Sequence, residues 1–145
     1  MVNCVSILGS TGSVGRQTLD IVEHLRLPVA ALTAGTNVQR MAQQCRRFRP
    51  QLAVMATEEA AMALEREISD LPTRVEWGEE GLIHAATVPE ADCVITAVVG
   101  MLGLKPTLAA IREKKRIGLA NKETLVCALV RPRLRPASIW PGSTA

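Results

Sequence analysis

Three glycines near the N-terminus recur at every third position of a short stretch that otherwise carries hydroxyl side chains. Residues 9–15 read GSTGSVG. In such a turn, backbone N–H groups and the positive end of a following helix dipole can bind phosphate, and Ser10, Thr11 and Ser13 add hydroxyl donors. No Lys-Ser or Lys-Thr follows the last glycine, which excludes the P-loop of nucleoside triphosphatases. The spacing is GxxGxxG rather than GxGxxG, so it indicates a pyrophosphate site but leaves a glycine-rich turn without a ligand open.

The residues after the second expected strand bear on which dinucleotide would bind. NAD-binding folds usually place an acidic residue about 20 positions after the glycines, where it binds the ribose 2′-hydroxyl. Here residues 33–37 read TAGTN, and Arg40 follows shortly after them. The absent carboxylate and the available guanidinium favour a 2′-phosphate and therefore NADP. The alternative for Arg40 is a solvated arginine on a helix surface.

The elements that must position these residues alternate along the chain. Short aliphatic runs predict strands at residues 5–8, 29–34, 52–56, 73–77, 93–99 and 116–120. Helical spacing of apolar residues predicts helices at residues 16–25, 38–48, 61–68, 79–86 and 106–115, with another opening at 121–123. This order predicts an α/β, Rossmann-like, doubly wound fold, with a mainly parallel sheet and helices on both faces.

The composition supports one domain and argues against nucleic-acid binding. Of the 145 residues, 48% are apolar, which is enough for one core. Three of the 17 basic residues lie in 129–145, which holds no acid, so 14 basic and 14 acidic residues balance in 1–128. We expect residues 1–128 to form an NADPH-binding domain and 129–145 to be an atypical, disordered tail rich in Arg and Pro.

The cysteines and the hydropathy give expectations about compartment and metal. The four cysteines are far apart and form no CxxC pair, so no zinc site is expected. Cys4 and Cys93 lie within aliphatic runs, which predicts buried free thiols and a reducing, cytoplasmic compartment. Neither a signal peptide nor a stretch of about 18 apolar residues occurs, so we expect neither export nor membrane spanning, and no membrane partner.

Several motifs, in the same order, resemble the 1-deoxy-D-xylulose 5-phosphate reductoisomerase family. They are residues 8–15 (LGSTGSVG) followed by 18–20 (TLD), 34–38 (AGTNV), 106–111 (PTLAAI) and 120–126 (ANKETLV), the last being the most distinctive. Together they extend the resemblance over residues 1 to about 127.

The resemblance implies roles for individual residues. Those that would hold the cofactor phosphates are Thr11, Gly12, Ser13 and Val14. Those that would surround the adenosine ribose and its phosphate are Gly35, Thr36 and Asn37. Asn121 and Glu123 would contact the nicotinamide side of NADPH, and Lys122 would contact the substrate. Without the resemblance, residues 121–123 would be interpreted as a helix cap and first turn.

The resemblance also implies an activity: isomerisation of a phosphorylated ketose and its NADPH-dependent reduction to 2-C-methyl-D-erythritol 4-phosphate. That reaction belongs to the non-mevalonate pathway of isoprene biosynthesis, requires Mg or Mn, and is carried out by a homodimer. Two departures are evident. Thr36 stands where family members can carry a basic residue, and no acid follows Glu123, although the family continues to an Asp-Ser-Glu metal motif. We therefore expect a chain truncated or frame-shifted after about Cys127, with no metal ligand and no catalytic residue of its own.

Other functions remain as alternatives. A short-chain dehydrogenase needs a catalytic Tyr, and the chain has none. A semialdehyde-dehydrogenase type of domain needs a nucleophilic cysteine, for which Cys127 is the candidate, but no activating His accompanies it. The non-enzymatic alternative is an NADP-binding module or an inert fragment.

Overall fold

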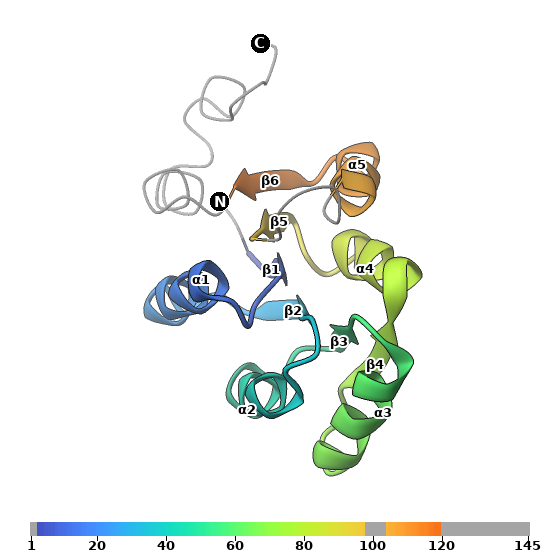
Figure 1. The fold of residues 1–145 in the computed structure, drawn as a ribbon. Coiled ribbons are helices and arrows are strands. Elements are labelled where there is room, and N and C mark those ends of the chain that lie inside the picture. Colours follow the sequence, from blue (N-terminus) through green and yellow to red (C-terminus); the bar gives the residue numbers. More distant parts are fainter. Residues whose placement is uncertain (1–2, 98–103, 120–145) are drawn as a thin grey trace.

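A six-stranded parallel sheet forms the centre of the protein (Figure 1). The computed structural model describes residues 3–97 and 104–119. Within these residues the strand order across the sheet is β4-β3-β2-β1-β5-β6. The strands are β1 (Val5–Leu8), β2 (Val29–Thr33), β3 (Leu52–Met55), β4 (Arg74–Trp77), β5 (Cys93–Thr96) and β6 (Arg116–Leu119).

Helices cover both faces of this sheet. They are α1 (Ser13–His24), α2 (Val38–Phe48), α3 (Glu58–Glu67), α4 (Gly78–Thr87) and α5 (Leu104–Arg112). The buried side chains of α1, α2 and α3 share one apolar cluster with the sheet, and those of α4 and α5 share the other. Figure 1 shows the same division, with α1 and α2 side by side on one face and α4 and α5 on the other. The predicted fold is confirmed.

The aliphatic strands explain why the sheet is buried on both faces. Every residue of β1 and of β3 is buried, and β2 is buried throughout. Strands in the interior of a parallel sheet read as continuous apolar runs because helices pack on both sides of them. At the edge, β4 is exposed or half-buried along its whole length. The core therefore lies above and below β1, β2, β3 and β5.

The order of the strands creates a switch point beside β1. From β1 the chain moves by way of α1 to β2 on one side, and later returns from β4 through α4 to β5 on the other side. All strands are parallel, so their carboxyl ends share one edge of the sheet. In open α/β sheets, ligands bind at this edge, next to the switch point.

Several predicted boundaries move by a few residues. The first helix begins at Ser13 rather than at residue 16, and α5 ends at Arg112 rather than at residue 115. Cys93 is buried as expected, but Cys4 is only partly buried, because it lies before β1 begins. Residues 121–123 and 129–145 lie outside the described residues. In residues 3–97 and 104–119, no helix is long and apolar enough to cross a membrane.

Candidate functional site

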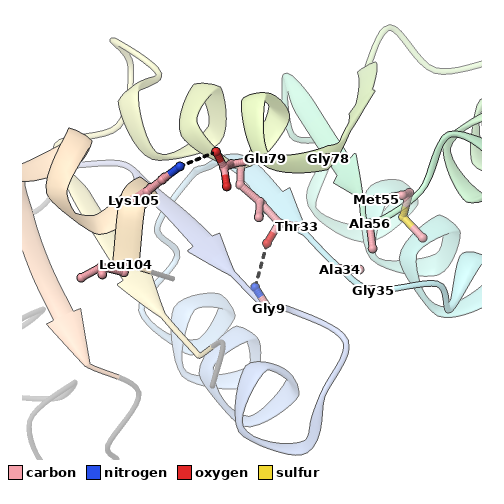
Figure 2. A pocket seen from close by; sticks show the side chains of 11 residues that line it. Gly9, Thr33, Ala34, Gly35, Met55, Ala56, Gly78, Glu79, Leu104 and Lys105 are labelled. Atoms are coloured by element: carbon pink, nitrogen blue, oxygen red, sulfur yellow. Dashed lines mark hydrogen bonds and ion pairs between the residues drawn. The ribbon is translucent and has the colours of Figure 1, made fainter. Parts of the chain in front are cut away.

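The glycine-rich loop is anchored to the end of β2 at its first residues. Gly9 has a φ of 86°, a left-handed conformation that favours glycine. The Gly9 N–H donates to the Thr33 hydroxyl oxygen at 2.9 Å, and the Ser10 N–H donates to the Thr33 carbonyl at 2.7 Å. Figure 2 shows the contact of Gly9 with Thr33. The loop therefore leaves β1 in a fixed direction, toward the start of α1.

Gly15 allows α1 to pack directly on this loop. A Cβ atom at Gly15 would lie 2.0 Å from the Gly9 carbonyl oxygen and 2.7 Å from the Ser10 Cα. Neither of these backbone atoms can move away without distorting the turn. Close packing of helix on strand is the role expected of the last glycine in a dinucleotide-binding loop.

The N-terminus of α1 is open. Gly12 is the N-cap residue, so no side chain accepts a hydrogen bond from the first turn, and that turn contains no acidic residue. A Cβ atom at Gly12 would meet no heavy atom within 4 Å. Gly12, Ser13 and Val14 are exposed, and Thr11 is half-buried beside them. The structure thus brings together the four predicted phosphate-binding residues around N–H groups of a helix start, which is a favourable place for an anion.

Ser10 differs from its neighbours, and the expectation that it adds a donor to the phosphate site is wrong. Its hydroxyl is buried and donates to the Gln44 Oε1 at 2.6 Å, while the Gln44 Nε2 donates to the Ser10 carbonyl at 2.9 Å. This exchange ties the loop to α2. Sequence reasoning missed Gln44, although its position between the buried Met41 and Cys45 could have indicated an inward-facing polar side chain.

Next to the loop, a cavity of about 560 Å³ opens at the carboxyl ends of the strands (Figure 2). Its lining comes from the ends of β2 and β3, from the residues that follow β1, β2 and β3, and from the first turns of α4 and α5: Gly9, Thr33, Ala34, Gly35, Met55, Ala56, Gly78, Glu79, Leu82, Leu104 and Lys105. The lining is mostly apolar, and an ion pair of 3.1 Å joins Lys105 to Glu79 between α5 and α4. A cavity of this size and character suits an organic group such as a nucleoside.

The turn after β2 places the second set of predicted residues at the same edge. Gly35 lines the cavity, and Gly35, Thr36 and Asn37 are all exposed. The Asn37 Oδ1 accepts the Arg40 N–H at 3.1 Å and so caps α2. The side-chain carbonyl of Asn37 is therefore engaged with the helix, and the side-chain N–H groups of Asn37 can donate to a ligand. Asn121, Lys122 and Glu123 are outside the described residues.

The thiols in the described part of the chain are not suited to nucleophilic chemistry. Burial raises the pKa of the Cys45 and Cys93 thiols to about 12. Burial, reinforced by the Asp92 carboxylate, also raises the pKa of Cys4. A thiol with a raised pKa stays protonated at neutral pH, and the thiolate is the reactive form. The described residues also contain no group of three or more His, Cys, Asp or Glu side chains that could hold a metal ion.

A doubly wound parallel sheet with a glycine-rich loop and an open helix N-terminus at its switch point defines the class of dinucleotide-binding α/β domains. Comparison with known proteins identifies the family. A sequence model of 1-deoxy-D-xylulose 5-phosphate reductoisomerase matches residues 5–128, and the chain belongs to this family.

Individual relatives and solved structures agree. The reductoisomerase of Lachnospira eligens is 53% identical over 125 residues, covering 86% of this chain and 33% of the relative. That of Heliobacterium modesticaldum is 48% identical over 149 positions, covering 97% of this chain and 38% of the relative, so the alignment extends past residue 128. The solved structure of the Zymomonas mobilis enzyme in complex with NADPH matches with a TM-score of 0.77 and 39% identity, over 88% of this chain and 34% of that one. The chain thus spans about a third of the length of its relatives.

Proposed function

We propose that this chain is the NADPH-binding part of a 1-deoxy-D-xylulose 5-phosphate reductoisomerase. The observation that carries the proposal is the open N-terminus of α1. A glycine cap without side chain, a first turn without acid, and free space at Gly12 leave room for a pyrophosphate. The adjacent cavity, lined by Gly35, would receive the adenosine. The Z. mobilis structure to which the chain is similar is described as a complex with NADPH.

In this assignment, different residues at the edge of the sheet bind different parts of the cofactor. Thr11, Gly12, Ser13 and Val14 bind the pyrophosphate through the helix N-terminus. The adenosine ribose and its phosphate contact Gly35, Thr36 and Asn37. The nicotinamide contacts Asn121 and Glu123, and the substrate contacts Lys122. Bound NADPH supplies the hydride, and the protein orients it and keeps the cofactor at the switch point.

In this proposal, this chain is the cofactor-binding portion of a protein, and that protein has the activity of the family. That activity is the isomerisation and reduction of 1-deoxy-D-xylulose 5-phosphate to 2-C-methyl-D-erythritol 4-phosphate, in the non-mevalonate route to isoprenoids. A related solved structure is described as a complex with NADPH, fosmidomycin and magnesium. The described residues of this chain do not fit a metal, since they bring no three potential ligands together.

For the same reason we propose that the 145-residue polypeptide by itself binds the cofactor without catalysing the reaction. No acidic residue follows Glu123 in the sequence, so the carboxylates that would hold a metal are absent from that part of the chain. An NADP-binding module without catalysis is therefore the second candidate for the isolated polypeptide. Metal-dependent oxidation of NADPH by the purified chain, with deoxyxylulose phosphate present and host enzyme excluded, would contradict this.

Calorimetry with NADPH and NADH tests the proposed function. Both cofactors carry the same pyrophosphate, so both should bind. NADPH should bind more tightly, because no acid at the end of β2 repels its 2′-phosphate and the Arg40 guanidinium can pair with it. One good hydrogen bond to a charged group contributes about 1.5–3 kcal/mol, which corresponds to a preference of about ten- to hundredfold.

A Gly12→Val variant tests whether the N-terminus of α1 binds the pyrophosphate. Its side chain enters the free space at the start of α1, where no protein atom lies within 4 Å of the Cβ position. The variant should therefore melt at nearly the same temperature as the unmodified chain and bind neither cofactor. Unchanged binding in this variant, or no binding in the unmodified chain, would reject the proposed function.

A further inference from the structure

Three arginines from two neighbouring helices line one small cavity near the glycine-rich loop. Helices α1 and α2 lie side by side on one face of the sheet (Figure 1). Between them lies a cavity of about 310 Å³, lined by Arg16, Leu19, Asp20, Arg40, Gln43, Gln44 and Arg47. The two helices thus contribute three guanidinium groups and one carboxylate to a single hollow.

Arg16 and Arg40 belong to the end of this cavity that faces the ligand edge of the sheet. The Arg16 N–H donates to the Gly12 carbonyl at 2.9 Å, so Arg16 follows the phosphate loop by one helical turn. The Arg40 N–H donates to the Asn37 Oδ1 at 3.1 Å, so Arg40 lies in the first turn of α2, directly after the turn that contains Thr36. Arg16 therefore follows the segment that would hold the pyrophosphate, and Arg40 follows the segment that would hold the adenosine ribose.

The third arginine is already neutralised within the protein. Arg47 forms hydrogen-bonded ion pairs with Glu23 and lies 3.5 Å from the Asp20 carboxylate. The hydrogen bond from Arg47 lowers the pKa of Glu23 and raises the pKa of Arg47 itself. Asp20, the one acid that lines this cavity, is thus engaged at the Arg47 end.

No such partner is found for the other two arginines. Within residues 3–97 and 104–119, no carboxylate lies within 4.0 Å of the guanidinium of Arg16 or Arg40. Arg40 is half-buried and Arg16 is exposed. Two guanidinium groups without an internal counter-ion, on the rim of one cavity, form a site for a doubly charged anion, because each can donate two parallel hydrogen bonds to phosphate oxygens.

We infer that Arg16 and Arg40 together bind the 2′-phosphate of NADPH and determine the preference for NADPH over NADH. This inference rests on the proposed function. Thr36, in the turn that would hold the ribose, carries no charge, so the cations come from the two helices that flank this turn. Arg40 approaches from the ribose side and Arg16 from the pyrophosphate side. The arrangement assigns a specificity role to Arg16, which no motif in the sequence indicates.

Titration of the 145-residue chain with NADPH, NADH, 2′,5′-ADP and 5′-AMP tests the inference. In Arg16→Gln and in Arg40→Gln, affinity for NADPH and 2′,5′-ADP should each fall by about tenfold, as for the loss of one charged hydrogen-bonded contact. Affinity for NADH and 5′-AMP should not change. The double variant should bind NADPH and NADH equally, and Arg40→Lys, which keeps the charge, should lose less than Arg40→Gln.

Arg66→Gln is the matched control, since it removes the same charge from α3, on the same face of the sheet. It should leave all four affinities unchanged. A double variant that still prefers NADPH would overturn the inference while the proposed function stands. A loss of NADH affinity equal to that of NADPH would also overturn it, because the arginines would then act on the pyrophosphate. Failure of the unmodified chain to bind either cofactor would instead reject the proposed function.

Discussion

Helices α1 and α3 occupy equivalent places in the fold, but their N-termini differ. Each follows a buried strand of the parallel sheet and begins at the same edge. In α3, the Thr57 hydroxyl oxygen accepts the Ala60 N–H at 3.2 Å, and Glu58 and Glu59 occupy the first turn. These groups satisfy the helix N-terminus and neutralise its partial positive charge.

In α1, the corresponding positions are left without such groups. The cap is Gly12, and Ser13 and Val14 stand where α3 has its two glutamates. At the third helical position α1 has Gly15, which contacts the loop backbone, whereas α3 has the buried Ala60. The N-terminus of α3 is therefore stabilised within the chain, whereas that of α1 is free for the anion proposed above. The comparison predicts where substitutions cost stability and where they cost affinity.

The largest loss of unfolding free energy is expected from a substitution at Gly15, the third residue of α1. In Gly15→Ala, the new Cβ would lie 2.0 Å from the Gly9 carbonyl oxygen, so α1 must move away from the loop. Overpacking of this kind costs about 3 kcal/mol of unfolding free energy or more. The matched change in α3, Ala60→Gly, should cost about 1 kcal/mol, mainly through helix propensity. Chemical denaturation measures both, and equal losses would contradict the assigned role of Gly15.

A substitution at the cap of α1 should change stability and cofactor affinity in opposite directions. Gly12→Asp gives α1 the kind of cap that α3 has, so unfolding free energy should rise by about 0.5 kcal/mol. The new carboxylate would stand where the pyrophosphate is proposed to bind, and the affinity for NADPH and NADH should both fall by more than about a hundredfold. Thr57→Asp is the control, with an acidic cap on α3 and unchanged cofactor affinity. A Gly12→Asp chain that binds normally would show that α1 does not bind the phosphates.

The sequence predicted elements well where local signals agreed. For α2 the expected bounds are those observed, because apolar spacing indicates the helix and the following Pro50 indicates its end. For α1 the expected start was three residues late. Glycine disfavours helices in general, and the sequence does not reveal that Gly15 lies inside the helix because of a contact with Gly9.

The parts of the site that depend on contacts between distant residues were not predictable. Ser10 has the residue type of a phosphate ligand, but Gln44, 34 positions away, turns its hydroxyl into the protein. Arg16 and Arg40 share a cavity only because α1 and α2 are neighbours on one face of the sheet. Periodicity and capping report on neighbours within a few residues, and none of these pairings is of that kind.

The smallest change is expected from a substitution at the cap of α3, which should affect stability alone. Thr57→Ala removes the hydroxyl oxygen that accepts the Ala60 N–H, and unfolding free energy should fall by about 1 kcal/mol, as is usual for a lost cap. Because Thr57 lies at the start of α3 and does not line the cavity beside the glycine loop, affinity for NADPH should be unchanged. Denaturation and calorimetry on the same preparation measure the two quantities. A loss of affinity in Thr57→Ala would mean that the N-terminus of α3 also serves the cofactor, and the contrast between the two helices would then not mark α1 as the phosphate site.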